Sequence, residues 1–247
     1  MHALQLDDML GEAHASLARV LAVYEWDWAG AEAEFKRAIE LNPRYATAHQ
    51  WYGGCLDATG RHDEAIVERK RALELDTVSL IFNFELGVAF YFARRYDQAI
   101  EQYQKALELD ARFPPVHALL PAAYEQTGMY DQAIDGFQKA VPAKQGTEWF
   151  NTISGLGHAY ARSGNTVAAR AVLEKLLQLS QKEYVPADAI GLVYAGLGEK
   201  DSALTWLEKA YEQRQFRMSW LKVEPRWDTL RSDPRFASLL RRMGLTS

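Results

Sequence analysis

The stretch RRYDQAIEQYQKALELD, residues 94–110, predicts one amphipathic helix with a turn in front of it. The turn ends at Tyr96, and Asp97 is of a residue type that caps the first turn of a helix. Small and apolar residues then recur in steps of three and four, which places them on one face of a helix. These residues are Ala99, Ile100, Tyr103, Ala106 and Leu107.

The same segment recurs along the chain, as RHDEAIVERKRALELD at 61–76 and MYDQAIDGFQKAV at 129–141. The alanine that follows the turn is found at positions 31, 65, 99, 133, 169 and 203, so successive copies are 34, 34, 34, 36 and 34 residues apart. A single helical hairpin cannot bury its apolar face, so the copies are expected to stack. The spacing therefore predicts a repeat architecture.

We predict an all-α fold, a right-handed α-solenoid of about six helical hairpins with a C-terminal capping segment. Residues 3–8 match the end of the repeated helix, which favours a piece of a longer protein over a short N-terminal cap. The solenoid is expected over 1–213 and the cap over 214–247. Within the solenoid, 1–10 is interpreted as the remnant of a preceding helix, and repeats are expected near 11–42, 46–76, 80–110, 115–141, 148–179 and 186–213.

Three departures from the repeat are visible in the sequence. The turn of repeat one, EWDWAG, is one residue longer than the others, and Arg69 stands where other copies have an aromatic residue or leucine. Pro121 replaces the small residue of a first helix, and a proline inside a helix removes a backbone donor. We expect a kink near His117, one turn earlier.

Composition excludes several classes of protein. Of 247 residues, 28 are Lys or Arg and 33 are Asp or Glu, giving a net charge of −5 with both signs interspersed. Such a balance is not that of a protein that binds nucleic acid or an anionic membrane. The single cysteine, Cys55, excludes an internal disulfide framework and a Cys-rich metal site.

No apolar run approaches the length of a membrane span. The N-terminal sequence MHALQLDDML has acidic residues where a signal peptide has a basic region. We therefore expect a cytoplasmic protein without a membrane partner.

The pattern resembles the tetratricopeptide repeat family over residues 11–213. The residues that carry the resemblance in repeat three are Leu86, Gly87, Phe90, Ala99, Tyr103 and Ala106. In repeat five they are Leu156, Gly157, Tyr160, Ala169 and Leu173. The tail WLKVEPRWDTLRSDPRF also resembles the ends of repeat arrays in multidomain bacterial regulators. This chain has no effector domain of such regulators, so none of their activities transfers.

The family resemblance implies a protein or peptide ligand in a concave groove lined by the first helix of each hairpin. Carried across by register, it implies the groove residues Arg19, Gln50, Asp57, Phe84, Val88, Tyr91, Glu125, Asn151, His158 and Arg162. In repeat three, spacing directs an apolar strip to the groove side, made of Ile81, Phe84, Val88, Tyr91 and Phe92. Such a strip favours partner binding there. The alternatives are that the C-terminal cap or a second copy of the chain covers it, or that the register is shifted by one residue.

The family members that bind chaperone C-termini use a clamp of lysine, asparagine and arginine. Here the corresponding positions carry Arg19, Asp57 and Val88, so that clamp is not assembled.

The sequence offers no strong candidate for catalysis or metal binding. His14, His49 and His117 occupy the same repeat position, which favours a packing role, and no histidine pair has the i, i+4 spacing of a helical zinc site. Ser219 and Lys222 match a Ser-x-x-Lys pattern without its companion motifs, which makes the match a coincidence. We expect no cofactor and no metal.

Three hypotheses for function follow. The leading one is a non-catalytic scaffold that binds a peptide or protein partner in the groove around repeat three. The second is assembly into a homodimer through the open N-terminal face. The third is a hydrolase with an unrecognised site.

Overall fold

The computed structural model describes residues 8–141 and 148–245, and each regular element within these ranges is a helix. The predicted all-α class is confirmed. The helices are α2 (Gly11–Val20), η1 (Leu21–Glu25), α3 (Trp28–Leu41), α4 (Ala46–Thr59), α5 (His62–Leu75), α6 (Leu80–Phe92), α7 (Tyr96–Leu109), α8 (Pro114–Gln126), α9 (Tyr130–Ala140), α10 (Glu148–Arg162), α11 (Thr166–Ser180), α12 (Ala187–Gly196), α13 (Lys200–Glu212), η2 (Phe216–Trp220), η3 (Pro225–Leu230) and α14 (Pro234–Arg242).

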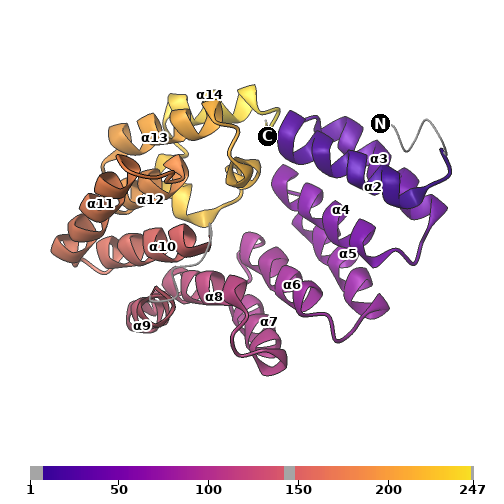
Figure 1. Cartoon of the computed structure of the whole chain (residues 1–247), viewed down its shortest axis with the longest axis horizontal. Helices are drawn as coiled ribbons and strands as arrows, with labels where there is room; N and C mark the ends of the chain where they lie inside the picture. Colours follow the sequence, from indigo (N-terminus) through magenta and orange to yellow (C-terminus); the bar gives the residue numbers. More distant parts are fainter. Residues whose placement is uncertain (1–7, 142–147, 246–247) are drawn as a thin grey trace. The chain divides into compact units, whose positions relative to one another are not determined.

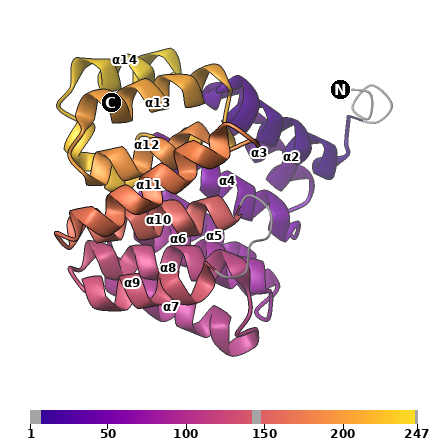
Figure 2. The same cartoon turned by 60° about the vertical axis from the view of Figure 1, so that its left-hand side comes forward.

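The helices pack in consecutive pairs, as the repeat register predicts, and the chain divides into two compact units. Of the described residues, unit 1 contains 8–109, Ser219–Val223 and 240–245, and unit 2 contains 110–141, 148–218 and 224–239. Unit 1 has the hairpins α2–α3, α4–α5 and α6–α7 (Figure 1). Unit 2 has the hairpins α8–α9, α10–α11 and α12–α13, which Figure 2 shows stacked one on the next.

Two predicted segments fall largely outside the described residues. The first is the remnant helix expected at 1–10, of which residues 1–7 are not described. The second is 142–147, between repeats four and five, where we expect a linker that accounts for the spacing of 36 residues in place of 34. Residues 214–247, expected as one cap, are divided between the units as far as they are described, because Ser219–Val223 and 240–245 pack with unit 1.

Each hairpin closes at a residue in the left-handed region of backbone conformation. These residues are Trp26, Gly60, Arg94, Gly128, Gly164 and Gly198, whose φ angles lie between 59° and 89°. They follow the same spacing as the repeated alanine, five residues before it in each copy. Glycine adopts this conformation without strain, which explains its choice at four of these positions.

The extra residue of repeat one lies within its first helix. The turn Leu21–Glu25 is a π-helix, which holds more residues per turn than an α-helix. It ends at Trp26, which occupies the closing position of the hairpin. Because the wider turn accommodates the insertion, the residues from Trp26 onward keep the repeat register.

The hairpin α6–α7 shows how the two helices of a copy approach each other. A Cβ atom added at Gly87 on α6 would lie 2.5 Å from Cε1 of Tyr103 on α7, and Tyr103 is fully buried. The tyrosine ring therefore occupies the space that a side chain at position 87 would need. In this repeat the glycine of the first helix thus lets the second helix come close.

In repeat four the small residue lies on the second helix, and the larger residue lies on the first. Pro121 is buried within α8, and the helix continues across it from Pro114 to Gln126. The small residue is instead Gly136 on α9, where an added Cβ would lie 2.8 Å from Cγ of Pro121. The close approach is thus retained with a glycine on the second helix. The predicted kink near His117 stays a prediction.

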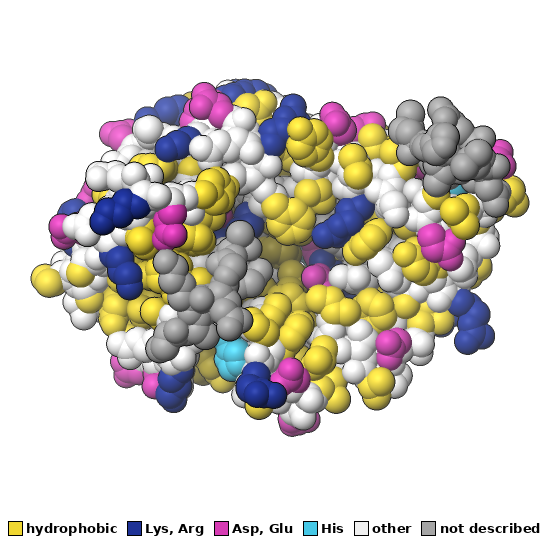
Figure 3. Space-filling view, in the orientation of Figure 1, with side chains coloured by type: hydrophobic (Ala, Val, Ile, Leu, Met, Phe, Trp, Pro, Cys, Tyr) yellow, Lys and Arg dark blue, Asp and Glu magenta, His cyan; other side chains and the backbone are white. Residues whose placement is uncertain are grey.

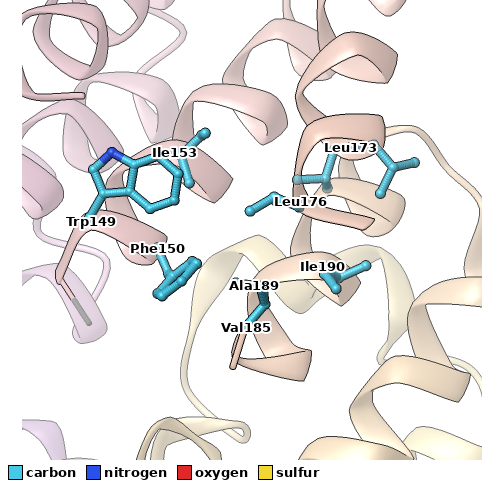
Figure 4. Packing of buried hydrophobic residues seen from close by; sticks show 9 residues of the cluster. Trp149, Phe150, Ile153, Leu173, Leu176, Val185, Ala189 and Ile190 are labelled. Atoms are coloured by element: carbon cyan, nitrogen blue, oxygen red, sulfur yellow. The ribbon is translucent and has the colours of Figure 1, made fainter. Parts of the chain in front are cut away.

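The core of unit 2 is built between its second and third hairpins. Trp149, Phe150 and Ile153 of α10 pack against residues of α11 and α12 (Figure 4). The buried members from α11 are Leu173 and Leu176, and Val185 precedes α12. This cluster joins consecutive copies, as expected if a single hairpin cannot bury its own apolar face.

Substitution of Gly87 by alanine should destabilise the chain by about 1–3 kcal/mol, because the new methyl group would overlap the Tyr103 ring. Gly54 is the matched control, since it also lies within a first helix and the nearest atom to an added Cβ is 3.5 Å away. Gly54→Ala should be neutral or stabilising by up to about 1 kcal/mol from helix propensity. Denaturant unfolding followed by circular dichroism compares the two. Equal stability of the two variants would contradict the close approach.

Candidate partner-binding surface

The residues predicted to line a groove lie on the first helices of the hairpins. In unit 1 these are α2, α4 and α6, and α4 contacts both of the others. We call the side of these helices that is not packed on α3, α5 and α7 the first-helix face of unit 1. Figure 3 shows one side of the molecule, on which basic and acidic side chains are interspersed.

Arg19 lies on this face above an aromatic ring. Its guanidinium carbon is 4.8 Å from the centre of the Trp51 ring, a cation–π contact between α2 and α4. Burial lowers the pKa of Arg19, and the carboxylate of Glu85 on α6 acts in the opposite direction. The predicted residue Arg19 is therefore brought together with two residues that the groove register omitted.

Gln50 and Ile81 are, together with Arg19, the predicted residues of unit 1 whose side chains remain accessible. Gln50 is half-buried on α4, and its side-chain amide has no hydrogen-bond partner within the described residues. Ile81 is 39% exposed on α6, an unusual position for a large aliphatic side chain. Both lie in the N-terminal half of their helices.

The rest of the apolar strip of repeat three is buried. Phe84 packs on Tyr103 with ring centres 5.8 Å apart, and Tyr91, fully buried, contacts Phe92 at 5.7 Å. Val88 is 6% exposed. These four strip residues are therefore buried and are not accessible to a partner in this structure.

A buried charge network lies beneath the first-helix face. Asp57 of α4 is fully buried, and its Oδ2 lies 3.1 Å from Nη2 of Arg69 on α5. The same nitrogen is 3.2 Å from Oε2 of Glu85, and Nη1 of Arg69 donates to the backbone carbonyl of Glu85. On its other oxygen, Asp57 is 3.1 Å from Nδ1 of His62. The arginine that departs from the repeat pattern thus neutralises a buried aspartate and connects α4 to α6.

In unit 2, two predicted residues form a pair. Nδ1 of His158 on α10 lies 2.5 Å from Oε1 of Glu125 on α8, and both side chains are buried. Asn151 accepts a hydrogen bond from Arg217, while Arg162 is exposed at the end of α10. Glu125 and His158 are therefore not accessible to a partner in this structure.

The repeated histidines have the packing role that their register predicts. Nδ1 of His14 lies 2.6 Å from Oε2 of Glu34, and its Nε2 lies 2.9 Å from the carbonyl oxygen of Asp8. His49 makes the corresponding contacts in repeat two, and His117 keeps the contact to a loop carbonyl. Each ring thus fastens the loop before a first helix.

Neither Ser219 of the Ser-x-x-Lys pattern nor Ser154, which lies in the stretch TISGLG, is placed for nucleophilic catalysis. Nζ of Lys222 donates to the carbonyl of Thr59, and Oγ of Ser219 is buried without a hydrogen-bond partner. Ser154 donates to the carbonyl of Asn151. Within residues 8–141 and 148–245, no group of three or more His, Cys, Asp or Glu side chains could hold a metal ion. None of the helices described is long and apolar enough to cross a membrane.

Comparison with protein families decides the identity of the repeats. Models of the tetratricopeptide repeat match residues 20–79, 95–128 and 188–215. The chain contains tetratricopeptide repeats. The resemblance inferred from the alanine register is confirmed.

Solved structures share this fold at low sequence identity. The structure of Pseudomonas aeruginosa pilF is 17% identical, with 86% of this chain and 96% of that chain covered and a TM-score of 0.57. YrrB, described as a TPR protein with an unusual peptide-binding site, is 18% identical over 84% and 96% of the chains, with a TM-score of 0.50. A chain of the APC/C hetero-tetramer Cut9–Hcn1 is 21% identical over 97% of this chain and 44% of that chain, with a TM-score of 0.64. The comparison with curated proteins finds no match.

Sequence reasoning missed several residues of this tetratricopeptide array. Trp51 and Glu85 lie beside predicted groove residues and have no separate signal in the sequence. Arg69 was visible as a departure from the pattern, which was the signal for its buried pairing. Trp220 contacts Phe92 and Lys222 contacts Thr59 although they lie far apart in the sequence, and no local sequence pattern predicts such contacts.

Arg69→Leu should destabilise the chain by about 3–5 kcal/mol, because it leaves the buried carboxylate of Asp57 without its cationic partner. Adding Asp57→Ala should recover part of this loss, since the double variant no longer buries an uncompensated charge. The matched control is Arg71→Leu on the same helix, which removes an exposed pair with Glu74 and should change stability by less than about 1 kcal/mol. Urea denaturation measures all three. A single Arg69 variant as stable as the parent would refute this network.

His14 should titrate above the ordinary histidine range of about pH 6.5. Burial acts to lower the pKa of His14, but hydrogen bonds to Glu34 and to the carbonyl of Asp8 outweigh it, and the net shift is upward. A raised folded-state pKa contributes stability that is present below the unfolded pKa and is lost as pH rises through the folded pKa. Proton NMR titration of the His14 ring measures the pKa directly.

Repeat three supplies the design of a control variant. There, the positions that correspond to His14 and Glu34 are Asn83 and Gln102, and Nε2 of Gln102 donates to Oδ1 of Asn83 at 2.7 Å. The variant His14→Asn/Glu34→Gln copies that uncharged pair, so its stability should vary less with pH above about 6.5. A His14 pKa at or below the ordinary value would show that the pairing is not formed.

Proposed function

We propose that this chain is a non-catalytic scaffold that binds an extended peptide segment of a partner protein on the first-helix face of unit 1. Tetratricopeptide repeats support a role in protein interaction, and the family and fold are typically non-catalytic. YrrB, which has the same fold, is described as having a peptide-binding site. That ligand class matches the one proposed here.

The observation that carries the proposal is the presence of an accessible amide and an exposed aliphatic side chain on two first helices that contact each other. The Gln50 amide offers both a donor and an acceptor, which suits the backbone of an extended peptide. Ile81 offers apolar contact to a side chain of that peptide. Arg19 and Glu85 add opposite charges on the neighbouring first helices α2 and α6, so the surface also favours a partner with both signs of charge.

The residues proposed to contact a partner are accessible, whereas most residues of the apolar strip predicted from spacing are buried. Phe84, Val88, Tyr91 and Phe92 are buried, so their contribution is to hold α6 in place beneath the accessible residues. Ile81 is the member of the strip that a partner can reach without rearrangement. The proposal therefore rests on Ile81 and Gln50, with repeat three still supplying the apolar contact.

The proposal is tested with a random-peptide display library selected against the full chain. Peptides that emerge should lose about tenfold or more in affinity for Gln50→Ala and for Ile81→Asp, corresponding to about 1.4 kcal/mol each. The first change removes hydrogen bonds to the peptide backbone, and the second places a charge against an apolar contact. Fluorescence anisotropy with labelled peptides measures the dissociation constants.

The matched control is Lys70→Glu, since Lys70 is exposed on the second helix α5, away from the first-helix face. The Lys70→Glu variant should bind the peptides with the same affinity as the parent chain. Peptides that bind both surface variants with unchanged affinity would contradict the proposal, as would a library that yields no binder.

A further inference from the structure

A short piece of the C-terminal region packs with unit 1. The chain up to Met218 and again from Glu224 to Leu239 belongs to unit 2, whereas Ser219–Val223 belongs to unit 1. We call Ser219–Val223 the inserted segment. It lies outside the repeats, which end with α13, so the hairpin pattern gives no reason for its position.

The inserted segment places an aromatic ring on the end of α6. Trp220 stacks on Phe92, the last residue of that helix, with ring centres 6.4 Å apart and an angle of 18° between the planes. Trp220 is half-buried, and its neighbours Leu221 and Val223 are buried. The end of α6 thus contacts an aromatic side chain that comes from more than a hundred residues further along the sequence.

The same segment places a cation on the end of α4. Nζ of Lys222 donates to the carbonyl oxygen of Thr59, the last residue of α4, at 3.0 Å. Gly60 follows in the left-handed conformation, and an added Cβ there would lie 3.6 Å from Nζ of Lys222. The last carbonyls of a helix lack partners within the helix and carry partial negative charge. The Lys222 ammonium donates a hydrogen bond to such a carbonyl and also places a positive charge beside it.

The fit of the segment is incomplete at Ser219. Oγ of Ser219 is buried and has no hydrogen-bond partner. A buried hydroxyl without a partner costs free energy relative to the same group in water. A segment that has a residue other than serine at this position would avoid that cost, so the inserted segment is not the best occupant that this surface could have.

We propose that the C-terminal ends of α4 and α6 form a binding surface for a protein segment that forms a tight turn, as Ser219–Val223 does, and has an aromatic residue followed two positions later by a lysine. The inserted segment is its resident occupant, and a partner with the same pair of side chains binds by displacing it. This surface goes beyond the one proposed above, because Gln50 and Ile81 lie in the opposite halves of the same two helices.

The test uses the full chain with Trp220→Ala and Lys222→Ala, which removes the two anchoring side chains of the resident occupant. The probe is a fluorescein-labelled peptide of residues 217–224, RMSWLKVE. The double variant should bind this peptide at least about tenfold more tightly than the parent chain, in which the inserted segment competes. Fluorescence anisotropy measures both affinities, and circular dichroism establishes that the variant is folded.

Two controls separate this proposal from a purely structural role and from the function proposed above. The same peptide with alanine in place of its tryptophan and lysine should not bind the double variant. Adding Phe92→Ala to the double variant should abolish binding of the original peptide, whereas adding Ile81→Asp should leave it unchanged.

A folded double variant that does not bind the peptide would overturn the proposal, as would a parent chain that binds it equally well. If the double variant unfolds, Lys222→Ala alone is tested, and it should bind the peptide more tightly than the parent chain because it keeps only the Trp220 contact. An unchanged affinity would then overturn the proposal.

Discussion

The array depends on the close approach of the two helices within each hairpin. Where Gly87 faces the buried ring of Tyr103, there is no room for a side chain on the first helix, so the ring of the second helix can sit against the backbone. Repeat four reaches the same result by a different route, with Pro121 on the first helix and Gly136 on the second. What is maintained from copy to copy is the distance between the helices, and the residue that permits it can change sides.

Repeat two places a charge where this arrangement normally has an aromatic or aliphatic side chain. Arg69 occupies the position of Tyr103 one copy earlier, and it is as deeply buried. A buried guanidinium requires compensation, which Asp57 and Glu85 provide from the two adjacent first helices. Polar contacts therefore connect α4 with α6 at the place where apolar packing connects other copies.

The sequence was sufficient to predict the hairpins, their register and the family, because each of these depends on contacts between residues fewer than about 40 positions apart that recur in every copy. It was insufficient for the accessible surface. Spacing places Phe84 and Tyr91 on a side of α6, but it does not report that their rings are covered by Tyr103, Phe92 and Tyr96. The contacts of Trp220 and Lys222 occur once, between distant parts of the chain, so no periodic pattern could contain them.

The π-helical turn Leu21–Glu25 shows how the first helix of repeat one accommodates an additional residue. An additional residue in an α-helix would rotate everything before it by about 100° relative to the rest of the helix. Here the wider turn takes up that rotation, and His14 still meets Glu34 as His49 meets Glu68 one copy later. In repeat one the first helix thus tolerates an insertion without loss of the contact between His14 and Glu34. Diversity in the length of first helices is therefore compatible with an undisturbed stack.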